Sequence, residues 1–127
     1  MKITILFTLL LSSGWMMAQP NFNAVIGALK AGDVASISGL MEAEVELAVG
    51  EESGTYPKAQ TIGKVEGFFQ QNKPSQCSLV HSGSARDGAS YYCIGSLTAG
   101  GKKYRVYIFF KKLESDYRIQ EMRIELE

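Results

Sequence analysis

Side chains that commonly carry acid, base or metal chemistry are sparse in this chain. It has one histidine, His81, and two cysteines, Cys77 and Cys93. Its aspartates fall in expected helix caps or turns, where they ordinarily bind the backbone: Asp33, Asp87 and Asp116. One histidine and two separated cysteines lack the ligand spacing of a metal site. The sequence therefore predicts no metal, no cofactor and no catalytic motif.

Glu121 is the remaining carboxylate that could act as a base. We expect Tyr92, Arg105, Tyr107 and Arg123 around it on one face of a sheet. A glutamate beside two arginines should have a lowered pKa, which makes it a poor base near neutral pH. A ladder of cross-strand ion pairs is the simpler interpretation.

The elements that would position these residues centre on a strand over residues 104–110. A two-residue turn at Gly100 and Gly101 precedes this strand, and a second turn over residues 114–116 follows it. The two hairpins pair Leu97 with Tyr104, Ile94 with Tyr107, Ile108 with Met122 and Val106 with Ile124. Three antiparallel strands follow from these two turns.

Before this strand, the apolar residues first follow the spacing of helices and then alternate with polar residues, as in a strand. Asn21 and Asp33 are expected to cap two short helices, the second of which carries Leu40 and Met41. The remaining predictions are a strand over 44–49, a polar turn over 51–54, a four-turn helix from Pro57 to residue 71, and strands over 76–82 and 90–97. Gly63 and Gly67 either weaken the long helix or let it lie close to the sheet.

These registers divide the predicted sheet into two faces. The dry face, which should receive Ile62, Phe68 and Phe69 of the long helix, holds Cys77, Leu79, Tyr91, Cys93, Leu97, Val106, Ile108, Phe110, Met122 and Ile124. The opposite face, called the mixed face below, holds Val80, Tyr92, Ile94, Arg105, Tyr107, Phe109, Glu121 and Arg123. Aromatic and charged residues together suit a pocket wall or a dimer interface. His81 is expected on the dry side or at its rim, in a structural role.

Cys77 and Cys93 form a disulfide in one interpretation and stay as buried thiols in the other. A tight turn over 86–88 places Cys93 opposite His81, too far from Cys77 to bond. A wider loop places the two cysteines directly opposite each other, and an oxidising compartment would favour the bond.

The first 18 residues predict export. Lys2, an apolar run from Ile3 to Leu11 and the small residue Ala18 are typical of a secretory signal peptide cut after Ala18. The apolar run is too short to span a membrane. Residues 19–127 then form a single domain, periplasmic or secreted. Basic and acidic residues number 13 each, which gives no general attraction to nucleic acid or anionic membranes.

The whole pattern resembles a known family. The features that carry the resemblance are the element order, the helix ending in Phe68 and Phe69, the Val80-His81-x-Gly83 strand and the closing strands over 104–107 and 119–125. They resemble small exported Bacteroidota proteins of the domain of unknown function four-seven-eight-three. That family is in turn similar to the nuclear-transport-factor-two-like, cystatin-like α+β superfamily. The resemblance implies a cone in which a curved antiparallel sheet of four to five strands packs on one long helix and two short N-terminal helices.

Three functional hypotheses follow. The first is a non-catalytic binding domain that holds a small ligand on the mixed face, in an enclosed and largely apolar cavity with Tyr107, Phe109 and Arg123 in its wall. The second is a protein whose mixed face is covered by a partner, including a second copy of itself. The alternative is a small enzyme of the isomerase or dehydratase type, which the superfamily resemblance implies and which would use a carboxylate inside the cone.

Overall fold

The computed structural model describes residues 19–127, which form three helices and six strands. In chain order these are α1 (Phe22–Ala31), α2 (Val34–Ser38), β1 (Met41–Val49), β2 (Glu52–Pro57), α3 (Lys58–Gln71), β3 (Pro74–Ser84), β4 (Ser90–Ala99), β5 (Lys102–Leu113) and β6 (Asp116–Leu126). The predicted signal peptide, residues 1–18, lies outside the described residues.

The helix boundaries follow from local capping chemistry. The Asn21 side chain accepts a hydrogen bond from the Ala24 amide at 3.0 Å, and Gly32 ends α1 in a left-handed conformation at φ 67°. Asp33 caps α2 in the same way through the Ser36 amide, and Pro57 directly precedes α3. Both predicted caps are confirmed. The prediction that α2 continues to Met41 is wrong, because Met41 begins β1.

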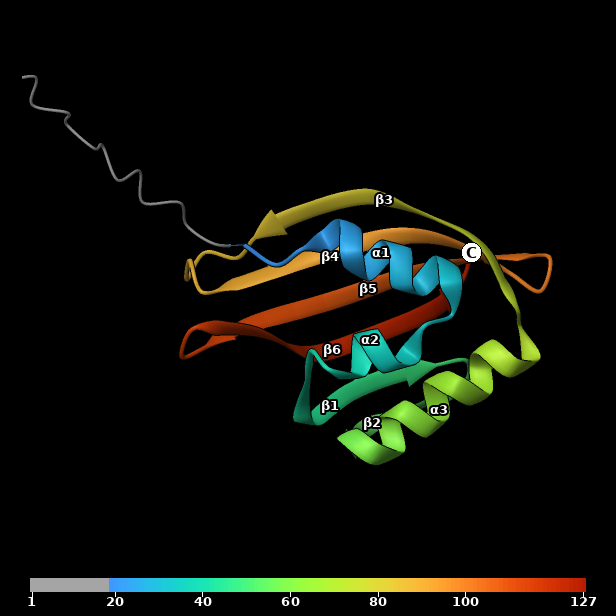
Figure 1. Ribbon diagram of the computed structural model, residues 1–127, viewed down its shortest axis with the longest axis horizontal. Coiled ribbons are helices and arrows are strands. Elements are labelled where there is room, and N and C mark those ends of the chain that lie inside the picture. The colour runs from blue at the N-terminus through green and yellow to red at the C-terminus, as the bar shows by residue number, and fades with distance from the viewer. Residues whose placement is uncertain (1–18) are drawn as a thin grey trace, which may run out of the picture.

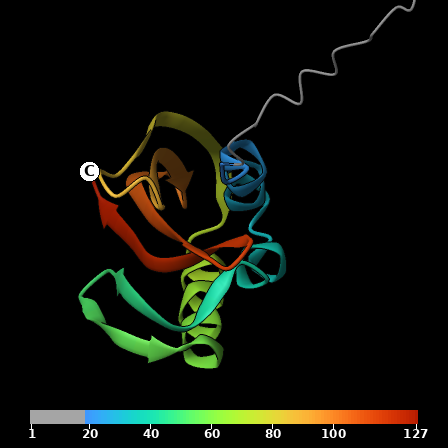
Figure 2. The same ribbon diagram turned by 90° about the vertical axis from the view of Figure 1, so that its left-hand side faces the viewer.

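The strands form one curved, unclosed sheet in the order β2-β1-β6-β5-β4-β3, with the helices on one side (Figures 1 and 2). The predicted α+β class is confirmed, but two details are wrong. The predicted polar turn over 51–54 is a tight turn followed by β2, so the sheet has more strands than expected. The sheet is also not wholly antiparallel, because β1 pairs with β6 in parallel.

The hairpin registers agree with the sequence prediction. Leu97 pairs with Tyr104, and Ile94 with Tyr107, across the turn at Gly100 and Gly101. Both glycines have positive φ, 58° and 76°, which a tight two-residue turn requires. The β5–β6 hairpin pairs Ile108 with Met122 and Val106 with Ile124, as predicted.

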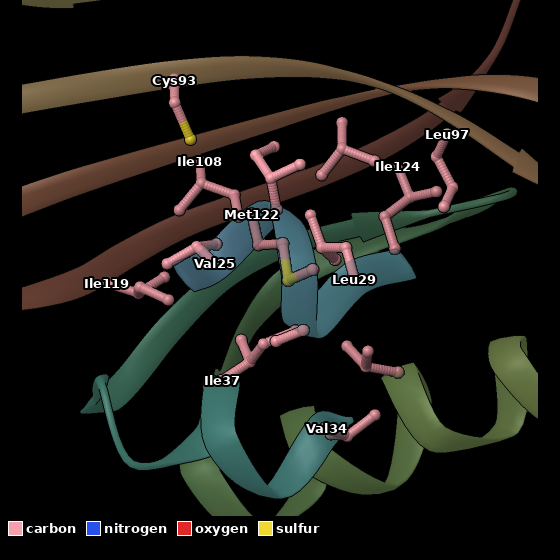
Figure 3. Close-up of a cluster of buried hydrophobic side chains, with 14 of the residues drawn as sticks. Val25, Leu29, Val34, Ile37, Cys93, Leu97, Ile108, Ile119, Met122 and Ile124 are labelled. Carbon is pink, nitrogen blue, oxygen red and sulfur yellow. The ribbon is translucent and has the colours of Figure 1, made fainter. Parts of the chain in front are cut away.

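The core lies between the helices and the dry face. Val25 and Leu29 of α1, Val34 and Ile37 of α2, and Ile108, Ile119, Met122 and Ile124 of the sheet meet there (Figure 3). Nine of the ten residues predicted for the dry face are buried. The exception is Leu79, which is 38% exposed and lies beside a bulge in the β3–β4 pairing. Leu79 pairs with Gly95, which pairs with Val106, so it stays on the dry side but on the edge strand β3.

The long helix covers only part of the sheet. α3 packs against β1 and β2, whereas α1 packs against β3 and β4 (Figure 1). The Phe22 ring of α1 also contacts the Phe110 ring at 5.9 Å between centroids. The dry face is therefore shared between α1 and α3, so the long helix covers less of it than expected.

The two glycines of α3 are not there to let the helix lie close to the sheet. A Cβ atom added at Gly63 or Gly67 would meet no atom within 4 Å. The close-packing hypothesis is therefore wrong for both positions.

Candidate functional site

Strand registers bring the mixed face together across all six strands of the described sheet. One row pairs successive strands through His81, Ile94, Tyr107, Arg123, Ala48 and Ser53. The next row runs through Gly83, Tyr92, Phe109, Glu121, Glu46 and Thr55. Paired residues lie on the same side of a sheet. The two rows therefore place the predicted site residues beside residues of β1 and β2.

Aromatic rings cover the β3–β5 half of this face. The Tyr92 and Tyr107 rings stack with centroids 6.2 Å apart and an interplanar angle of 23°. The His81 ring lies 5.5 Å from the Tyr92 ring. Tyr92 also leans over Gly83, where an added Cβ would come within 2.9 Å of the Tyr92 hydroxyl. Gly83 thus leaves the space that the Tyr92 side chain occupies.

The predicted position of the histidine is wrong. His81 is exposed and pairs with Ile94, so it lies on the mixed face rather than on the dry side. The cause is the bulge between Leu79 and His81, since one extra residue reverses the facing of the residues after it. Val80 lies at this bulge and is 63% exposed.

The other half of the face is hollowed and acidic. A hollow of about 470 Å³ is lined by Glu44, Glu46, Thr55, Tyr107, Phe109, Gln120 and Glu121. A second hollow of about 250 Å³ shares Glu46, Thr55 and Glu121 with it and adds Arg123. Tyr107 and Phe109 are half-buried beside the larger hollow. The lining is more polar than the largely apolar cavity that the binding hypothesis predicted.

The charges around Glu121 differ from the predicted ladder. The Arg123 side chain donates to Glu121 Oε1 from both Nε and Nη2 at 3.3 Å. Arg105 instead lies 3.9 Å from Glu127, so only one arginine accompanies Glu121. Glu44 and Glu46 make no ion pair within residues 19–127. The larger hollow therefore carries two unmatched negative charges.

The tyrosine in the hollow is electrostatically perturbed. Removal from water raises the pKa of Tyr107, and the Glu121 carboxylate raises it further, while Arg123 acts in the opposite direction. The phenol therefore stays protonated at neutral pH and can donate a hydrogen bond.

The two cysteines lie on the dry face as free thiols. Cys77 pairs with Leu97 and Cys93 with Ser82, so the two are offset along the β3–β4 ladder, as in the tight-turn interpretation. Cys93 falls opposite Ser82 rather than His81, because of the bulge. Burial, and to a smaller extent Cys77, raises the pKa of the Cys93 thiol to about 12.

Sequence reasoning missed the residues that β1 and β2 contribute, namely Glu44, Glu46 and Thr55. The alternation of Glu44 and Glu46 with Val45 and Leu47 did indicate a wet strand face. What the pattern could not show was the parallel pairing that places Glu46 next to Glu121. A non-local parallel contact leaves no turn signal in the sequence.

The profile of the family described as "Domain of unknown function (DUF4783)" matches residues 22–125. The chain belongs to the DUF4783 family. It is similar to a DUF4783 protein from Bacteroides ovatus, with 31% identity, TM-score 0.77, and 86% of this chain and 96% of that chain covered. A DUF4783 protein from Bacteroides uniformis is 27% identical, with TM-score 0.78, and 85% and 98% covered.

The DUF4783 fold is NTF2-like. An NTF-2-like protein of unknown function from Silicibacter pomeroyi superposes with TM-score 0.59 at 11% identity, with 84% of this chain and 89% of that chain covered. No curated protein matches the chain at a significant level. The predicted family is thus confirmed, and the predicted NTF2-like fold is confirmed as a fold.

Two further properties concern membranes and metals. Among residues 19–127, no helix has the length and apolar character needed to cross a bilayer. In the same range, no group of three or more His, Cys, Asp or Glu side chains is arranged to hold a metal ion.

Proposed function

We propose that this DUF4783 protein is a non-catalytic, exported binding domain that holds a small organic molecule bearing a basic group on its mixed face. The observation that carries the proposal is the hollow of about 470 Å³ in which Tyr107 and Phe109 lie beside Glu44, Glu46 and Glu121. Small-ligand sites commonly combine aromatic walls with a few placed polar groups.

The charge of the hollow supports a cationic ligand. Glu46 pairs with Glu121 across the β1–β6 ladder, and like charges at paired positions repel. Arg123 contacts Glu121 and Glu125, and it leaves Glu44 and Glu46 without an ion-pair partner within residues 19–127. An ammonium group beside Glu46 and Glu121 would relieve this repulsion, and the faces of aromatic rings such as those of Tyr107 and Phe109 attract cations as well.

The same hollow gives less support to an enzyme. Glu121 is hydrogen-bonded to Arg123, and His81 lies across the sheet from it, on β3. An acid and a base poised around one substrate atom would need to lie within hydrogen-bond reach of it. Glu121 and His81 therefore do not form such a pair.

Native mass spectrometry of the protein purified from its own host tests the proposal. We expect a retained small molecule whose mass identifies an amine. Titration with 2-phenylethylamine, followed by NMR, should then show binding that Glu46→Gln or Phe109→Ala weakens about tenfold. Glu51→Gln is the matched control, because Glu51 lies in the β1–β2 turn outside both hollows. A ligand-free protein that also ignores the amine would reject this function.

A homodimer through the mixed face is the second candidate. Val80 is exposed, and Ile94 and Tyr92 are only half-buried, so apolar surface extends beyond the hollow towards β3. The same mass spectrum reports the oligomeric state. In this case we expect a dimer that Ile94→Glu converts to monomers, because the substitution buries a charge in the interface. A wild-type protein that is monomeric in light scattering excludes it.

A further inference from the structure

A third and larger hollow lies on the helix-covered side of the sheet, away from the mixed face. It has a volume of about 820 Å³ and is bordered by the C-terminal half of α3 and by the ends of β1, β5 and β6. These elements meet near the C-terminus in Figure 1. The volume falls within the range of small-ligand sites.

The floor of this hollow is apolar, and ring contacts and hydrogen bonds fix the positions of its side chains. Phe68 and Tyr104 meet edge to face with centroids 5.0 Å apart, and Ile124 lies next to them in the lining. The Tyr104 hydroxyl donates to Asn72 Oδ1 at 3.3 Å, and Asn72 Nδ2 donates to the Phe68 carbonyl at 3.1 Å. These bonds satisfy the polar atoms of the floor and hold the two rings in place. Leu126, 63% exposed, extends the apolar surface to the edge.

Gly67 keeps the hollow open. It lies inside α3, where glycine costs about 1 kcal/mol relative to alanine. No neighbour explains this glycine, because an added Cβ would meet no atom within 4 Å. Gly67 does line the hollow. A side chain at this position would therefore grow into the open space above Phe68.

The rim of the hollow carries one lysine that makes no ion pair within residues 19–127. Glu52 pairs with Lys64 at 3.1 Å, and Glu125 lies 3.8 Å from Arg123. Lys102 also lines the hollow and makes no ion pair within residues 19–127. An apolar floor with a single free ammonium group at its edge complements a molecule with an apolar body and one anionic head.

We propose that this hollow binds a small, free amphiphile with a single anionic head, of the medium-chain carboxylate class, with its tail over Phe68, Tyr104 and Ile124 and its head at Lys102.

Sodium decanoate and decyltrimethylammonium bromide test this proposal, because they share a tail and differ in head charge. The protein is residues 19–127, which contain every element of the described fold. Isothermal titration should show binding of decanoate and weaker or no binding of the cation. We expect Gly67→Leu and Lys102→Glu each to weaken decanoate binding about tenfold or more.

The controls are matched to each variant. Gly63→Leu makes the same substitution four residues earlier in α3, outside the hollow and equally free of contacts. Lys103→Glu makes the same charge change on the neighbouring residue, which does not line the hollow. Both should bind decanoate within about twofold of the wild type. Tyr107→Ala on the mixed face should also bind normally, which separates this site from the proposed function.

Three results would overturn the proposal. The first is a wild-type protein that does not bind decanoate. The second is equal affinity for decanoate and decyltrimethylammonium. The third is a Gly67→Leu variant that binds decanoate as tightly as the Gly63→Leu variant does. Circular dichroism of each variant confirms that it is folded.

Discussion

At the scale of single residues, the dry face places a thiol where it cannot ionise at ordinary pH. Cys93 is buried among the core side chains, and its pKa is raised to about 12 chiefly by burial. A group whose pKa is higher in the folded than in the unfolded state favours folding while it is protonated. This contribution is complete below the ordinary thiol value of 9.0 and is lost as pH rises towards 12.

We therefore expect the free energy of unfolding to fall between pH 9 and 11 in part because of Cys93. Urea unfolding at pH 8 and pH 10.5 measures the fall, and Cys93→Ala serves to isolate the thiol from the lysines and tyrosines that titrate in the same range. The variant will be less stable overall, but its stability should decline less with pH. An identical decline in both proteins would show that the thiol is not the cause.

At the scale of elements, α3 is less stable than its length allows. Gly63 is exposed, and no close neighbour requires a glycine there. The cost of the residue is therefore conformational, since glycine loses more backbone freedom on entering a helix than alanine does. Gly32 is the opposite case, because its φ of 67° and the Pro74 Cγ atom, 3.1 Å from an added Cβ, both disfavour a side chain.

Gly63→Ala should raise the free energy of unfolding by about 0.5–1 kcal/mol. Gly32→Ala should lower it by about 1 kcal/mol or more, because alanine is strained at positive φ. Chemical denaturation with far-UV circular dichroism measures both. A stabilised Gly32→Ala protein, or a destabilised Gly63→Ala protein, would contradict the assigned conformations.

At the scale of the whole molecule, a single buried cluster joins all three helices to the sheet within residues 19–127. Ile119 and Met122 of β6 are fully buried in this cluster, and β6 lies between β1 and β5. Domains of this size with one core usually unfold in a single cooperative step. The β1–β2–α3 part and the β3–β6 part should not unfold separately.

Ile119→Ala should destabilise the protein by about 2–5 kcal/mol, because it removes a buried side chain and leaves a cavity. Unfolding followed by tyrosine fluorescence and by far-UV circular dichroism should give coincident transitions in the wild type and the variant. Two separated transitions would indicate that α3 and the β1–β2 hairpin form an independent unit.

The parts of the fold that local signals specify were predictable from the sequence. The caps at Asn21 and Asp33 and the turn at Gly100 and Gly101 use residues whose preferences arise within a few positions. Alternation along β5 and β6 then determines which side chains share a face, and so most of the mixed face could be grouped correctly. The family resemblance added the superfamily fold.

The remaining errors have non-local or subtle causes. The parallel β1–β6 pairing joins strands that are about 75 residues apart in the sequence and are not connected by a single turn. The sequence therefore carried no sign that Glu46 would lie beside Glu121. The bulge at Val80 inserts a single residue without a distinctive sequence signal, yet it moves His81 to the other face. The division of the dry face between α1 and α3 depends on the curvature of the sheet, which the hydrophobic pattern of a helix does not encode.

The central place of the final strand has a consequence for biosynthesis. β6 supplies the edge on which both β1 and β5 pair, so β1 has no inner neighbour until residues 116–126 have left the ribosome. A nascent chain that lacks them can form the hairpins on either side but cannot unite them. Completion of the sheet therefore requires residues 116–126, and a nonsense codon before Asp116 would leave two separate fragments of a sheet rather than a shortened domain.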